Sequence, residues 1–88
     1  MAEALTEGYV QHLKIMPAAQ VAIVEIGPTP SDAEELRVLI PSSADASQCA
    51  LRAEMISLLS SAMIAGRRVG ATHDEADSDI TGVGVLVP

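Results

Sequence analysis

The sequence predicts a mixed, mainly β domain in which five strands form either a barrel or a curved antiparallel sheet, with one long helix between the third and fourth strands. Three observations support this class. Short runs of alternating or β-branched apolar residues are separated by Gly and Pro. One long helical stretch carries capping signals at both ends. The chain has 88 residues without an internal repeat, which fits one domain over 1–88.

The first two strands form the first predicted hairpin. In residues 9–16 most apolar side chains share one parity while His12 and Lys14 have the other, which is typical of a strand with one wet face. Residues 17–19 interrupt it, and residues 20–26 resume as a strand. This second strand is apolar on both faces, so we expect it to be covered twice, by a central place in the sheet or by a subunit contact.

Residues 28–35 are predicted to be a loop, because two prolines disfavour regular pairing and Ser31 and Asp32 favour turns. Residues 36–40 then form the third strand, with apolar side chains at alternate positions, and Pro41 ends it.

The helix is predicted over 46–65, with Asp45 capping its start and Gly66 stopping it in a left-handed conformation. Its apolar arc covers about half the circumference, wider than the roughly 100° that packing on one sheet requires. Either loop residues or another subunit covers the excess. The predicted oligomer interface comprises four helix residues and two from the second strand: Met55, Ile56, Leu59, Met63, Val24 and Ile26.

A second hairpin completes the predicted sheet, with a short strand over 69–72, an acidic turn over 73–79 and a last strand over 80–87. His73 is therefore expected in a turn. Gly82 and Gly84 share one face of the last strand, which favours a close approach there by a packed helix or a sharp barrel bend.

Charge and composition exclude several classes of partner. Five basic residues stand against twelve acidic ones, a net charge of −7 that repels phosphate backbones, and one tyrosine cannot supply base-stacking platforms. No apolar run approaches the roughly 20 residues of a membrane span, and the start shows no secretory signal. We expect no nucleic acid, no membrane and a cytoplasmic location.

No catalytic, cofactor or metal site is predicted. The start of a calcium-loop pattern at Asp77 and Asp79 fails at its twelfth position, Pro88, where a bidentate glutamate is required. Cys49 is the single cysteine, and no pattern sets a base and an orienting carboxylate beside it. Three Cys and His residues in total are too few for a usual structural zinc site. The chain is therefore predicted not to be an enzyme.

The run Leu58–Val69, the acidic turn after it and the stretch Asp79–Val85 together resemble the helix and last hairpin of small bacterial B subunits of the OB-fold type. Those proteins assemble as ring pentamers around a helix-lined centre. The resemblance implies a five-stranded barrel and a ring-like assembly. It does not imply glycan binding or toxin delivery, because the intrachain disulfide and the aromatic sugar-binding residues of that family have no counterpart here.

These observations predict a non-enzymatic, self-associating scaffold or interaction module. Two alternatives remain open: a module that binds a small molecule or peptide, and an accessory subunit of a larger complex. In each case an unidentified protein partner is compatible with the sequence.

Overall fold

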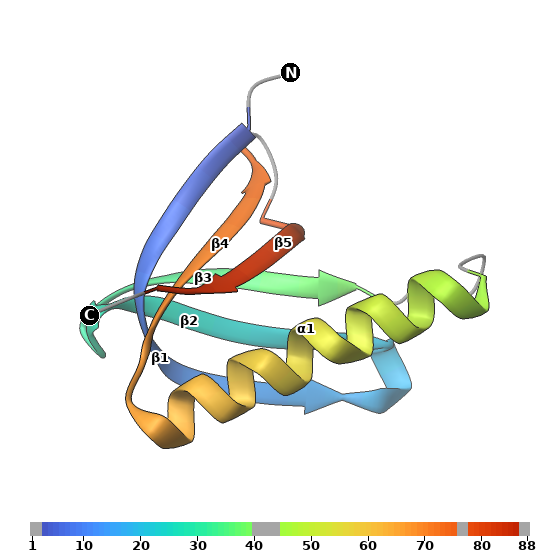
Figure 1. Ribbon diagram of the computed structural model, residues 1–88, viewed down its shortest axis with the longest axis horizontal. Helices are drawn as coiled ribbons and strands as arrows, with labels where there is room; N and C mark the ends of the chain where they lie inside the picture. The colour runs from blue at the N-terminus through green and yellow to red at the C-terminus, as the bar shows by residue number, and fades with distance from the viewer. Residues whose placement is uncertain (1–2, 40–44, 76–77, 87–88) are drawn as a thin grey trace.

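A computed structural model describes residues 3–39, 45–75 and 78–86, which form five strands and one long helix (Figure 1). The strands are β1 (Glu3–Met16), β2 (Val21–Thr29), β3 (Asp32–Leu39), β4 (Arg68–Asp74) and β5 (Ile80–Val85). The helix α1 (Ala46–Ala65) follows β3 and precedes β4, and a 3-10 turn, η1 (Pro17–Ala19), joins β1 to β2. The expected strand ends at Ile40 and Val87 lie outside the described residues.

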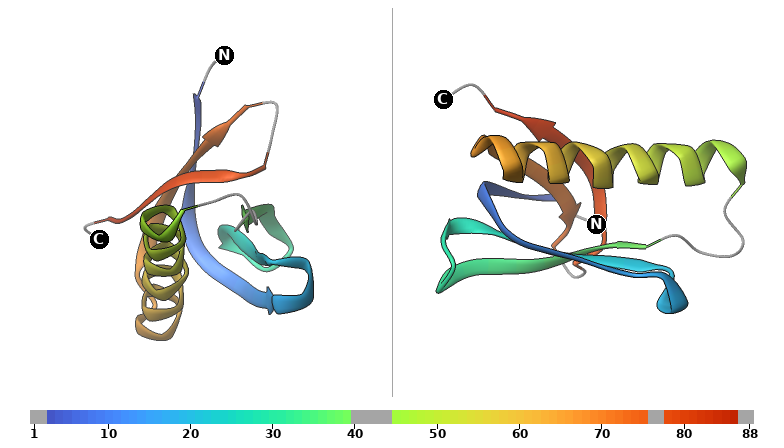
Figure 2. Two further views of the ribbon diagram at one scale, coloured as in Figure 1. Left: turned by 90° about the vertical axis from the view of Figure 1, so that its right-hand side faces the viewer. Right: turned by 90° about the horizontal axis from the view of Figure 1, so that it is seen from below.

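All five strands belong to one antiparallel sheet in the order β3-β2-β1-β4-β5. The sheet curls, as the two views in Figure 2 show, but it is not closed into a barrel. Within the described residues, its two end strands meet at one parallel bridge, Arg37 to Asp79, beside a 2.8 Å hydrogen bond from Arg37 N to Ser78 O. The prediction of a curved antiparallel sheet is confirmed, and the barrel alternative is wrong.

Two glycines permit the curl where β1 changes partner. The first half of β1 pairs with β4 and its second half pairs with β2. At the change, a Cβ on Gly8 would lie 2.8 Å from the backbone of Gly27, and Gly8 has a φ of 153°. A Cβ on Gly27 would lie 2.1 Å from the carbonyl oxygen of Asp32. Only glycine lets three strand backbones approach this closely.

The predicted loop over 28–35 is wrong. β2 continues to Thr29 and β3 begins at Asp32, so only Pro30 and Ser31 separate the two strands. Pro28 is tolerated inside β2 because the pairing with β3 shifts between Ile26 and Thr29. At such an irregularity the regular ladder does not require an amide from Pro28.

The helix limits are confirmed at both ends. Asp45 Oδ1 accepts from Gln48 N at 2.8 Å, and Gly66 adopts a left-handed φ of 67°. Leu59 and Ala62 alone among the described helix residues are fully buried, so most of the predicted apolar arc is not fully buried in the single chain. Figure 1 shows the reason: the first turns of α1 extend past the ends of the strands, where the sheet cannot cover them.

The core is aliphatic and lies between the concave face of the sheet and α1. It contains no aromatic residue, and all five strands and α1 contribute side chains to it. The buried apolar residues are Val10, Ala22, Val24, Ile26, Leu36, Val38, Leu59, Ala62, Val69, Ala71 and Ile80. β2 lies between β3 and β1, and its Ala22, Val24 and Ile26 face is buried as predicted. The predicted cover on its other face is not complete in the single chain, since Val21 and Ile23 are half-buried.

Candidate interaction surface

The two ends of the open sheet differ in charge. β3 carries Asp32, Glu34, Glu35 and Arg37, whereas no residue of β5 is charged. Charges on an edge strand discourage pairing with another strand, and an uncharged, proline-free edge permits it. In a chain of net charge −7, the edge of β5 is therefore the one suited to accept a further strand.

The backbone of β5 is oriented for such pairing. Leu86 N donates to Arg68 O at 2.8 Å, so these two residues form a hydrogen-bonded antiparallel pair. Because the pairs alternate along the ladder, Gly84, opposite Gly70, also turns its amide and carbonyl toward β4. Val83 and Val85 consequently turn theirs toward the open edge.

The helix faces only the first four of the six residues of this edge strand. A groove of about 430 Å³ separates α1 from β5 and is lined on the strand side by residues 80–83. Arg52 lines this groove, and its buried Nη1 lies 3.7 Å from Oδ1 of Asp79. Gly84 and Val85 are exposed. The last two residues of β5 therefore lie outside this groove and are exposed.

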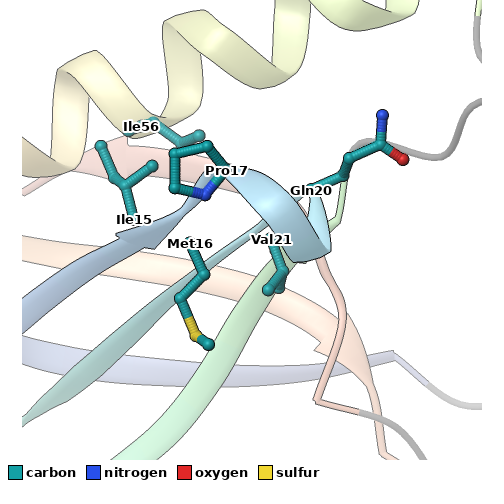
Figure 3. Close-up of a pocket in the computed structure, with 6 residues that line it drawn as sticks. All are labelled: Ile15, Met16, Pro17, Gln20, Val21 and Ile56. Carbon is teal, nitrogen blue, oxygen red and sulfur yellow. The ribbon is translucent and has the colours of Figure 1, made fainter.

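A second, apolar pocket of about 300 Å³ lies where the β1–β2 hairpin passes under α1 (Figure 3). Its lining is almost entirely carbon, and Ile56 of the helix faces the hairpin across it. The lining residues are Ile15, Met16, Pro17, Gln20, Val21 and Ile56. This volume falls at the lower end of small-ligand sites.

His73 is not a turn residue, as the sequence predicts, but is 5% exposed near the end of β4. Its Nε2 lies 3.0 Å from Thr6 Oγ1, which donates to Glu34 Oε1 at 2.9 Å. Its Nδ1 donates to the carbonyl of Asp74 at 3.0 Å. This network joins β1, β3 and β4, and the sequence pattern did not indicate it because the three residues lie far apart in the chain.

The predicted interface residues fall into two groups. Val24, Ile26 and Leu59 are fully buried in the core of a single chain, so they have no surface to offer a partner. Met55 and Ile56 are half-buried against the core, and Met63 is 37% exposed. The most exposed apolar helix residues are Ile64, at 82%, and Leu51, at 66%. The β5 edge was not predicted, although the lack of charge in the last strand signalled it.

Across residues 3–39, 45–75 and 78–86, no group of three or more His, Cys, Asp or Glu side chains could hold a metal ion. Asp77 of the partial calcium pattern lies outside them. Cys49 is half-buried in the first turn of α1, and His12 lies exposed on β1 as predicted. No helix in the described part of the chain is long and apolar enough to cross a membrane.

Comparison with known proteins adds no relative to this picture. No protein-family model matches the chain, and no curated protein matches it.

Proposed function

We propose that this protein is a non-enzymatic, self-associating interaction module. The observation that carries the proposal is the open edge of β5 at one end of the sheet. β5 contains no charged residue, and the backbone groups on its outer side can pair with a further strand. Edge strands of this kind are usually protected by charge, proline or a covering element. Neither charge nor proline occurs in β5, and the helix faces only residues 80–83 of it.

The apolar helix surface supports the same proposal. Leu51 and Ile64 of α1 are 66% and 82% exposed in the single chain, and the aliphatic core is small. Domains of this size hide only about 60% or slightly more of their unfolded surface, so additional burial against a second chain would raise their stability. Self-association would supply that burial without requiring a different partner.

Light scattering across a dilution series tests the proposal. A multiple of 9.1 kDa at the higher concentrations is the expected result, and a clean monomer at all concentrations would contradict it. Two chains would favour pairing at a single strand edge. Five chains would favour the ring assembly implied by the resemblance to OB-fold B subunits.

Charge substitution tests how much of the interface belongs to the helix. Met63→Glu places a carboxylate on a partly exposed apolar position, and Ser61→Glu adds the same charge at an exposed polar one. If α1 forms the interface, Met63→Glu lowers the molar mass and Ser61→Glu does not. Unchanged assembly in both variants would count against the helix and leave the β5 edge. Leu59 is unsuitable for this test because a charge in the core would unfold the chain.

The apolar pocket at the β1–β2 hairpin favours a second candidate, binding of a small apolar molecule. Titration with toluene, followed by methyl resonances, would then shift Ile15 and Ile56, which line the pocket, but not Ile64. If all three resonances stay in place, or all move equally, the pocket is not a specific site.

A further inference from the structure

We propose that two copies of this chain pair antiparallel through their β5 edges, about a twofold axis at Gly84. This inference rests on the proposed self-association. The pairing would extend the five-stranded sheet of one copy into that of the other. A twofold arrangement uses the same patch on both copies and closes after two chains.

The register follows from which amides face outward. Val83 and Val85 both turn their backbone groups to the open edge, and Gly84 lies midway between them. With the axis at Gly84, Val83 of each copy stands opposite Val85 of the other, and each such pair exchanges two hydrogen bonds. This register uses the regular part of β5 and leaves out Thr81, where the pairing with β4 shifts.

Gly84 suits the position on the axis. In the dimer, Gly84 of one copy would lie opposite Gly84 of the other as a non-hydrogen-bonded pair, in which the two Cα atoms approach to about 4.5 Å. A Cβ on Gly84 would meet no atom within 4 Å in the single chain, so the space above this residue is open. The axis also lies beyond the part of β5 that faces α1, since the groove under the helix ends at Val83.

The charges around β5 favour an antiparallel second copy over a parallel one. The end of the strand lies beside Arg68, to which Leu86 is hydrogen-bonded. Its beginning lies beside Glu3, which accepts from Thr81 Oγ1 at 3.4 Å, and beside Asp79. Antiparallel pairing brings the basic end of each copy toward the acidic beginning of the other. Parallel pairing would place like charges together, which costs stability.

A contact of a few residues on each strand is small. It falls at the low end of specific interfaces, which bury roughly 1,200 Å² or more. We therefore expect a dimer that dissociates in the micromolar range, on the order of −8 kcal/mol in standard free energy. Dilution would then reveal both monomer and dimer.

Cysteine cross-linking tests the axis. In a Cys49→Ser background, Gly84→Cys should form a reducible dimer under mild oxidation, because its Cα separation of about 4.5 Å suits a disulfide. Thr81→Cys is the matched control: its side chain is also exposed, but its two copies would stand about 20 Å apart, at ~3.4 Å per residue. Equal cross-linking of both variants, or none for Gly84→Cys, would overturn the proposed axis.

A backbone substitution provides an independent measurement. Val85→Pro removes an outward amide that β4 does not use, whereas Val85→Ala keeps it. We expect at least a tenfold weaker dimer for Val85→Pro and a much smaller effect for Val85→Ala, both by light scattering with circular dichroism as the folding check. If the protein self-associates but neither test implicates β5, the proposed function stands and this interface is wrong. If the unmodified protein is a monomer throughout, both are wrong.

Discussion

Truncation of two leucines on the same helix tests whether the packing described above determines stability. Leu59 is 0% exposed and contacts the concave face of the sheet, whereas Leu51, at the groove between α1 and β5, is 66% exposed. Leu59→Ala and Leu51→Ala remove the same atoms from the same type of secondary structure. Any difference in unfolding free energy therefore reports burial.

The expected magnitudes follow from exposure. Leu→Ala deletes three carbons, worth about 0.8 kcal/mol each when buried, and a residual cavity adds to the loss. For Leu59 we expect a destabilisation of about 3–4 kcal/mol. For Leu51, one third buried, the transfer contribution is about 0.8 kcal/mol, and the better helix propensity of Ala offsets part of it. A domain of this length has a total stability of roughly 4–13 kcal/mol, so Leu59→Ala removes a large share.

Urea denaturation followed by circular dichroism measures both values, at a concentration where the unmodified protein is monomeric. The two-state slope should be similar in all three proteins. Equal losses for the two variants, or a loss below about 1.5 kcal/mol for Leu59→Ala, would refute the packing of α1. Repeating the measurement at high concentration adds a functional readout, because a Leu51→Ala loss that grows with concentration would place Leu51 in the interface.

Three further substitutions follow from local geometry. Asp45→Ala removes the helix cap and should cost about 1 kcal/mol in unfolding free energy, while Asp45→Asn should retain most of it, as urea denaturation would show. Gly27→Ala should prevent folding or lower the thermal midpoint by well over 10 °C, because its Cβ would overlap the β3 backbone; Gly84→Ala, with open space, should change the midpoint by a few degrees at most. Thr6→Val removes the hydroxyl between His73 and Glu34 and should cost about 1–3 kcal/mol, whereas Thr6→Ser should preserve the network; equal stability of the two variants would contradict its role.

The helix shows what local sequence determines well. Its limits, the Asp45 cap and the left-handed Gly66 were predicted correctly, because each depends on residues within one turn of the helix end. What covers its apolar arc was left open between loop residues and another subunit. The width of an apolar arc does not reveal how much of it the sheet covers, and in the structure Leu51 and Ile64 remain exposed.

The strands show the same division. Alternating apolar residues located the second half of β1 and most of β2, but the first half of β1 was missed because its partner, β4, follows more than 50 residues later. Proline content predicted a loop at Pro28 that the structure does not contain. A proline is excluded from a strand only where its missing amide would have to donate to the neighbouring strand. At Pro28 the shift in the pairing of β2 with β3 removes this requirement, and that shift cannot be seen in the sequence of β2 alone.

The sequence by itself determined the number and order of the strands and the helix, the helix caps and the aliphatic character of the core, since these follow from local periodicity and from composition. Only the tertiary structure decided that Val24, Ile26 and Leu59 belong to the core of one chain rather than to an interface. It also decided that His73 is buried and that β5 ends the sheet. These outcomes depend on strand order and curl, which arise from contacts between residues far apart in the chain.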